Sequence, residues 1–161
     1  MTDSELERYM RQYYKSVYRI ALCRCRDPQD ADDVAQDVFL RLYTCGNTFN
    51  DDEHIKAWLF RCAINHSTDL IRARKRRESL PLKDAQAAVH YDEKDKESGR
   101  VFELFMKLGE KNRTAMYMHY CEGYTVKEIA EMTGSKESAV LSRLMRGRKQ
   151  LEKLLNNERG R

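Results

Sequence analysis

Apolar residues recur every three or four positions over most of the chain, which is the period of an amphipathic α-helix. From Ser4 to about Arg26, the repeat consists of Leu6, Met10, Tyr13, Val17, Ile20 and Ala21, widened by Tyr9, Tyr14 and Tyr18. Asp27 and Pro28 suit the cap and first residue of a second helix. Its apolar side consists of Ala31, Val34, Ala35, Val38 and Leu42. A third helix is predicted from 52–54 to Arg77, with a core side of Ile55, Leu59, Cys62, His66 and Leu70. The first half of the chain therefore predicts a helical bundle.

The second half of the chain also has helical periodicity, and its clearest stretch is Tyr124–Leu151. Thr125 and Glu128 have the spacing of a capping box, and Gly134 suits the residue after the last helical turn. Ser135 is then the predicted cap of a longer helix, whose buried stripe is Val140, Leu144, Gly147, Leu151 and Leu154. Two helices before this stretch are predicted to support it through Val101, Phe102, Phe105, Leu108, Ala115, Met116, Met118, Tyr120 and Cys121.

A short capped helix, a turn with glycine and a longer basic helix predict a helix-turn-helix, which lays its second helix in the major groove. The candidate residues for duplex DNA are Lys136, Ser138, Ala139, Ser142, Arg143, Arg146 and Lys149, with Met145 on the same exposed side. The alternative is an ordinary helical hairpin with a solvated basic face.

Glu78–Gly99 breaks the periodic pattern with Pro81, mixed charges and few apolar residues. We expect it to be a flexible linker. The predicted fold class is therefore all-α, with two small helical domains, 1–77 and 100–161, joined by the linker 78–99.

The outer face of the second predicted helix carries Asp33, Gln36, Asp37 and Leu40. Acidic outer faces are commonly just solvated. A bare leucine among acids also suits docking on a basic partner helix.

A second row of residues follows the third predicted helix beside its core stripe: Trp58, Arg61, Asn65, Asp69, Arg72 and Arg76. Aromatic, amide and guanidinium groups in one row can stack on unpaired bases, bond their edges and hold phosphates. The alternative is that Trp58 belongs to the core and that Asp69 pairs with an arginine.

The chain has 161 residues and a formal charge of +4, and its basic residues gather at Arg72–Arg77 and Arg143–Lys149. Its five cysteines are an odd number without a framework spacing, and no signal peptide or long apolar run precedes them. We therefore expect a reduced, cytoplasmic setting and no membrane insertion. Cys62 and His66 are four residues apart, as metal ligands can be, but without further ligands nearby core packing is favoured. No nucleophile, acid–base pair or phosphate loop is recognisable, so we expect neither an enzyme nor a cofactor or metal.

Three of these stretches occur in the order seen in RNA polymerase sigma factors. They are DADDVAQDVFLRLY (30–43), AWLFRCAINHSTDLIRARKRR (57–77) and YTVKEIAEMTG with SRLMRGRKQL (124–151). The chain resembles the sigma-70 family, in particular the short extracytoplasmic-function (ECF) type that keeps conserved regions 2 and 4.

The resemblance implies a role for each surface. The face of Asp33, Gln36, Asp37 and Leu40 would bind the coiled coil of the largest subunit of core polymerase. Phe49, in the loop 44–52, and Asn65 would hold a flipped base of the minus-10 element, beside Trp58, Arg61, Arg72 and Arg76. The helix-turn-helix would read the duplex minus-35 element and rest against the polymerase flap. The implied partners are core RNA polymerase, duplex and single-stranded promoter DNA, and an anti-sigma factor.

The chain departs from the family pattern in the second predicted helix-turn-helix element. Ser138 and Ala139 replace a usual Gly-Thr pair, and Leu141 stands where a basic residue is common, so the minus-35 preference does not follow from the resemblance. Gly147 replaces a usual alanine, which weakens the helix by up to about 1 kcal/mol but permits a closer helix contact.

Two other functions compete with this interpretation. A stand-alone helix-turn-helix regulator would explain 124–151 but not the acidic face or the Trp58 row. A pure interaction protein would bind other proteins through its helices and would not bind DNA.

Overall fold

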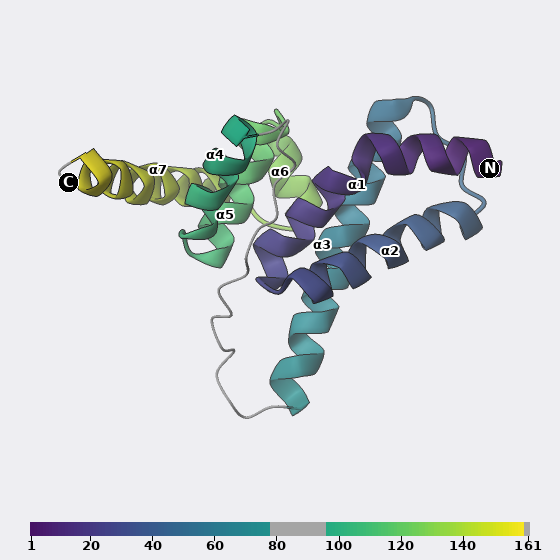
Figure 1. The fold of residues 1–161 in the computed structure, drawn as a ribbon, viewed down its shortest axis with the longest axis horizontal. Helices are drawn as coiled ribbons and strands as arrows, with labels where there is room; N and C mark the ends of the chain where they lie inside the picture. The colour runs from purple at the N-terminus through teal and green to yellow at the C-terminus, as the bar shows by residue number, and fades with distance from the viewer. Residues whose placement is uncertain (78–95, 160–161) are drawn as a thin grey trace. The chain divides into compact units, whose positions relative to one another are not determined.

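A computed structural model describes residues 1–77 and 96–159 (Figure 1). Within these residues the regular elements are all helices, and they form two compact units, one in each described range. The predicted all-α fold with two small helical domains is confirmed. The predicted linker falls mainly on 78–95, outside the described residues. Its last four residues, 96–99, belong to a helix.

The first unit is a bundle of α1 (Asp3–Cys25), α2 (Pro28–Thr44) and α3 (Asp52–Arg77), in which each helix contacts the other two. Capping fixes the starts of α1 and α2. Thr2 and Glu5 form a capping box, and the Asp27 carboxylate accepts from the N–H groups of Gln29 (2.8 Å) and Asp30 (3.2 Å). Arg26, at a φ of 60°, makes the turn between the two helices.

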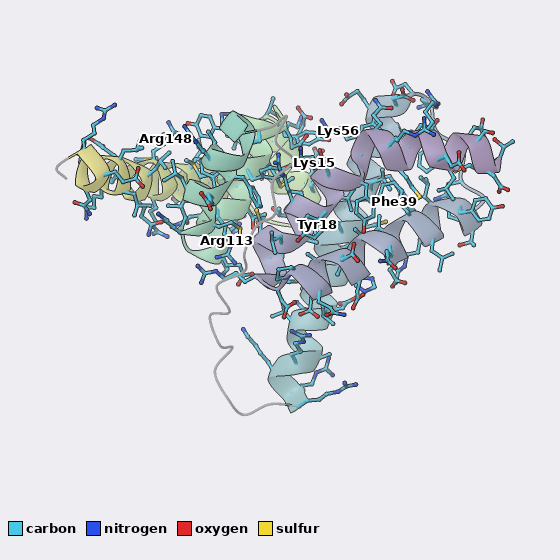
Figure 2. The ribbon with its side chains drawn as sticks, in the orientation of Figure 1. Lys15, Tyr18, Phe39, Lys56, Arg113 and Arg148 are labelled. Atoms are coloured by element: carbon cyan, nitrogen blue, oxygen red, sulfur yellow. The ribbon has the colours of Figure 1, made fainter. Side chains whose placement is uncertain are left out.

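The core of this unit matches the predicted stripes of α1 and α2 and extends beyond them. All five predicted residues of α2 are buried, and so is Phe39, which lies between α1 and α2 and stacks on Tyr14 (Figure 2). On α1 the predicted stripe is buried at Tyr9, Tyr13, Val17, Ile20 and Ala21, whereas Leu6, Met10, Tyr14 and Tyr18 are half-buried.

The predicted core side of α3 is wrong in part. Ile55 and Leu59 are buried, but Cys62, His66 and Leu70 are only half-buried. The buried residues of α3 are Ile55, Leu59, Phe60, Ala63, Ile64 and Ser67. Because α3 packs against both α1 and α2, its buried arc is wider than one stripe and is rotated away from Cys62 and His66. Figure 1 shows the last turns of α3 projecting past the other two helices.

The second unit contains α4 (Lys96–Met106), α5 (Glu110–Met116), the π-helical turn η2 (Tyr117–Cys121), α6 (Val126–Thr133) and α7 (Glu137–Arg159). Phe102, Phe105, Leu108, Ala115, Met116 and Met118 are buried as predicted, whereas Val101 is 42% exposed. They support α6 and the first half of α7 through Ile129, Ala130, Met132, Val140 and Leu144.

Tyr120 and Cys121 were predicted to support the helix-turn-helix from the core, and this prediction is wrong: both lie in the π-helical turn and are exposed. Tyr117 and Tyr124 are buried instead, and the Tyr117 hydroxyl donates to the Glu122 carboxylate at 2.6 Å. The Glu122 N–H bonds the Tyr117 carbonyl five residues back. This wider turn rotates the following side chains away from the positions that a period of 3.6 residues predicts.

Gly147 of α7 lies against the Met116 side chain of α5. A Cβ added at Gly147 would lie 2.6 Å from Cγ of Met116. The predicted close helix contact is therefore present, and the glycine makes room for the Met116 side chain.

Candidate nucleic-acid interface

The predicted row on α3 is an exposed face of the first unit. Arg61, Asn65, Asp69, Arg72 and Arg76 are all exposed, and Trp58 is half-buried at the start of the row. We call these six residues the α3 stripe. Figure 2 shows nitrogen-bearing side chains extending from the projecting last turns of α3. A nucleic acid can therefore reach the amide and guanidinium groups of the stripe without displacing core residues.

Trp58 belongs to a small aromatic cluster that joins the loop 44–52 to α3. The Phe49 ring meets Trp58 edge to face at 5.7 Å and His54 at 5.2 Å. The loop is fastened by the Asp51 carboxylate, which accepts from the His54 N–H (2.8 Å), and by the Asn50 N–H, which donates to His54 Nδ1 (3.2 Å). Trp58 is half-buried, and its ring meets Phe49 of the loop. Sequence reasoning missed His54, which orders Phe49.

One arginine of the basic run does not belong to the exposed face. Arg74 forms an ion pair with Asp30, a buried residue in the first turn of α2. Burial raises the pKa of the Asp30 carboxyl, and the Arg74 charge opposes that rise. Because 44 positions separate the two residues, no local pattern in the sequence indicates this pair.

The acidic outer face of α2 is exposed as predicted. Asp33 and Gln36 are exposed, Leu40 is 59% exposed, and Asp37 is half-buried. Asp37 faces His66 of α3, with 3.3 Å between its Oδ2 and His66 Nδ1. Gln36 donates to Asp32, which also accepts from the Tyr14 hydroxyl, and burial is the main cause that raises the Tyr14 pKa.

Tyr43 extends this surface by one helical turn beyond Leu40. Its ring is 42% exposed and its hydroxyl donates to the Asp3 carboxylate of α1 at 2.7 Å. Sequence reasoning missed Tyr43, although its spacing of three residues from Leu40 places both on one side of the helix.

The exposed face of α7 carries the predicted candidates for duplex DNA. Lys136, which precedes the helix, and Ser138, Ser142, Arg146 and Lys149 are exposed, while Ala139 and Arg143 are half-buried. The guanidinium of Arg143 donates to Ser135 Oγ at 2.9 Å. One hydrogen-bond donor of the Arg143 guanidinium is therefore occupied by Ser135, which precedes α7.

The capping role predicted for Ser135 is wrong. The helix begins at Glu137, and the Lys136 carbonyl accepts the first N–H groups, from Ala139 (3.1 Å) and Val140 (3.2 Å). Lys136 thus occupies the position before the helix, and the Ser135 hydroxyl binds Arg143 instead. The rest of the motif is confirmed: Thr125 and Glu128 form the capping box, and Gly134 has a φ of 66°.

The described residues contain no group of three or more His, Cys, Asp or Glu side chains that could hold a metal ion. Burial raises the Cys62 pKa, as it does that of Cys25 to about 11, which leaves both thiols protonated near neutral pH. In 1–77 and 96–159, no helix has the length and apolar character that crossing a membrane requires.

Two family models match the chain. Sigma-70 region 2 matches residues 9–77, and Sigma-70, region 4 matches residues 98–151. Among curated proteins, the ECF RNA polymerase sigma factor SigM of Mycobacterium tuberculosis is 28% identical over 149 residues, which cover 92% of this chain and 76% of that protein. The ECF RNA polymerase sigma factor SigM of Bacillus subtilis is 27% identical over 158 residues, covering 94% and 95%.

Two solved structures share the fold. The sigma factor RpoE, in complex with the anti-sigma factor NepR from Bartonella quintana, aligns with a TM-score of 0.69 and 21% identity, over 94% of this chain and 97% of that one. CnrH, in complex with the cytosolic domain of CnrY, aligns with a TM-score of 0.63 and 24% identity, over 97% and 90%.

Proposed function

The chain belongs to the sigma-70 family as a sigma factor of the ECF type, and on that premise we propose which of its surfaces perform each step of promoter-specific transcription initiation. Sigma factors are not enzymes: they lend sequence recognition to core RNA polymerase, which carries out the catalysis. The partners of this chain are core polymerase and promoter DNA.

Core polymerase binds the outer face of α2 through Asp33, Gln36, Asp37 and Leu40 in this proposal. The observation that supports it is a leucine that is 59% exposed between acidic side chains, on a helix whose opposite side is the core. Burying Leu40 against a basic helix, here the coiled coil of the largest subunit, would remove its apolar surface from water and match the acids with positive charge. Tyr43 lies beside Leu40 and would widen the contact.

The minus-10 element binds along the α3 stripe and the aromatic cluster. Phe49 and Trp58 offer ring surface to an unstacked base, Asn65 offers both a donor and an acceptor, and Arg61, Arg72 and Arg76 hold phosphates. Such groups bind separated strands better than closed duplex. Binding would therefore shift the promoter toward the open state by the difference between the two affinities.

The minus-35 element binds the exposed face of α7, with its major groove over Lys136, Ser138, Ala139, Ser142, Arg143, Arg146 and Lys149. The single observation that carries this step is the helix-turn-helix geometry of α6, Gly134 and α7, whose exposed face is basic. We assign minus-10 recognition and polymerase binding to the domain 1–77, and minus-35 recognition and flap contact to the domain after the linker.

An anti-sigma factor is a further proposed partner, supported by the similar structure of the sigma factor RpoE, which was solved with the anti-sigma factor NepR bound. Since polymerase and promoter DNA are its partners, we place its action in the bacterial cytoplasm.

The test is run-off transcription with purified core polymerase, with and without this protein, on promoters selected from a genomic library. Transcripts that need the protein support the proposal. A stand-alone regulator would bind duplex without directing core polymerase, and a pure interaction protein would bind no DNA.

The polymerase surface is tested by the double change Asp37→Lys and Leu40→Ala. It should abolish co-purification with core enzyme and leave the thermal midpoint nearly unchanged, because Leu40 is exposed and Asp37 lies at the edge of the core. The matched control makes the same kinds of change at exposed residues of α4, with Glu103→Lys and Val101→Ala, and should keep co-purification. A folded double variant that still co-purifies at the level of the control would refute the assignment.

A further inference from the structure

Two exposed apolar side chains lie one turn apart near the start of α7. Leu141 is 48% exposed and Met145 is 58% exposed. Their spacing of four residues places them on one side of the helix, about 40° apart around its axis. Water-exposed large apolar residues are ordinary when they stand singly. The exposure of two such side chains, one turn apart in the first turns of a helix proposed to bind DNA, calls for a further explanation.

The surroundings of this pair fit DNA. Ser138 and Ser142 lie beside it on the exposed face, and Arg146 and Lys149 continue that face toward the C-terminus. Arg146 lies about 100° around the helix from Met145. Around the helix, the face thus runs from an apolar edge, through a centre with the two hydroxyls and Lys149, to a cationic edge at Arg146. The cationic edge would bind a polyanion such as DNA. For Leu141 and Met145 to be buried in the same complex, that polyanion must also present apolar surface to the apolar edge.

The major groove offers one apolar group, the C5-methyl of thymine. The first turns of a recognition helix are the part that contacts base edges. We propose that Leu141 and Met145 read thymine methyl groups in the minus-35 duplex, so that they help to set its sequence. Residues four apart are separated by about 6 Å along a helix, which is close to two base-pair steps of about 3.4 Å. The methyl groups would therefore belong to thymines about two steps apart, on either strand. This inference rests on the proposed function of α7.

The experiment uses the full chain with core polymerase. The preferred minus-35 duplex is first selected from a randomised pool, and its affinity is measured. Each thymine is then replaced singly by deoxyuridine, which removes the methyl group and keeps every hydrogen-bonding group of the base. With the wild-type chain, affinity should fall about fourfold at one or two thymines, the effect expected for burying one methyl-sized apolar group.

The same duplexes are then bound by Leu141→Ala and Met145→Ala. Each variant should bind the thymine duplex more weakly and should no longer distinguish thymine from deoxyuridine at its own position. The matched control is Val101→Ala, which shortens an exposed apolar side chain of α4 in the same unit. The control should keep the full preference for thymine at both positions.

Three results would overturn the inference while leaving the function of α7 intact. They are a selected element without thymines, deoxyuridine effects that are the same in wild type and both variants, and variants that lose polymerase or anti-sigma binding but keep duplex binding. The last result would mean that the pair meets protein. Selection that enriches no minus-35 sequence at all would instead contradict the proposed function of α7.

Discussion

The two helices proposed to contact DNA, α3 and α7, are similar in length, at 26 and 23 residues, and both have basic exposed faces. They differ in the uncharged residues that accompany the basic residues on each face. The α3 stripe carries a tryptophan, an amide and arginines, with Phe49 held against it by the loop. The face of α7 carries small hydroxyls and the pair Leu141 and Met145. Flat rings and amides can stack on and hydrogen-bond unpaired bases, whereas hydroxyls and apolar side chains can contact the edges of stacked base pairs in the major groove.

The helices also differ in how they are anchored. α3 is tied to α2 by an ion pair, since Arg74 pairs with the buried Asp30. α7 is anchored by close approach, because Gly147 lets the Met116 side chain of α5 lie against the helix backbone. A basic residue on α3 therefore either pairs with a buried acid inside the unit or stays exposed for a ligand. Local charge density in the sequence does not distinguish these two roles, whereas the burial and the ion-pair partner of each residue do.

The largest effect is expected at the anchor of α3. Arg74→Ala leaves the buried Asp30 carboxylate without its cation. Because the Arg74 side chain is 38% exposed, the loss in free energy of unfolding of the first unit should be about 2 to 3 kcal/mol, below that of a fully buried pair. The measurement is urea unfolding followed by fluorescence of Trp58, the one tryptophan of the chain, which lies in this unit. Arg76→Ala, at an exposed position two residues on, is the matched control and should change stability by less than about 0.5 kcal/mol.

The pH dependence of this loss tests its cause. Burial already raises the Asp30 pKa in the folded chain, and removing Arg74 should raise it further above the unfolded value of about 4. A carboxyl with a raised folded-state pKa loses stability as the pH rises through that pKa. The deficit of Arg74→Ala relative to wild type should therefore be largest at neutral pH and should shrink as the pH falls toward about 4, because both folded-state pKa values lie above that. A deficit that stays constant with pH would assign the effect to lost packing.

A smaller effect is expected at the α3 stripe itself. Asn65→Ala removes an exposed amide, so stability should be unchanged while binding to single-stranded minus-10 DNA weakens by about 1 to 2 kcal/mol. Binding of the minus-35 duplex should be unaffected. Asn156→Ala, an exposed asparagine on the last turns of α7, is the control for both measurements. Equal losses on single strand and duplex would show that Asn65 is structural. They would also show that single-strand and duplex binding are not separated between the α3 and α7 faces.

Much of this comparison could be predicted from local sequence. The caps at Asp27 and Thr125, the turn at Gly134 and the exposed face of α7 depend on residues within a few positions of one another. Helical period and capping chemistry determine such features, and the structure has each of them as predicted. The α3 stripe was also predicted, because an exposed face needs no knowledge of what packs on the other side.

The features that were missed depend on distant partners. The buried side of α3 differs from the predicted stripe because two helices pack on it, and the ion pair of Arg74 was not predicted because Asp30 is 44 residues away. The π-helical turn at Tyr117–Cys121 changed which tyrosines are buried, and no composition rule indicates such a turn. Ser135 was misassigned for a similar reason: its hydroxyl binds Arg143, eight residues later, in place of a backbone group.

The smallest effect expected separates charge from apolar contact on α7, through the salt dependence of duplex binding. Arg146 is exposed and is proposed to hold a phosphate, so Arg146→Ala should make the slope of log affinity against log salt shallower by about one unit. Leu141→Ala should weaken binding while leaving that slope unchanged, because an apolar contact releases no counterion. The measurement is a salt titration of the full chain with core polymerase on the minus-35 duplex, with Val101→Ala as the control for both quantities. If Leu141→Ala changes the slope and Arg146→Ala does not, the face that meets the phosphates is the apolar edge, and the orientation proposed for α7 is off by about 140° around the helix axis.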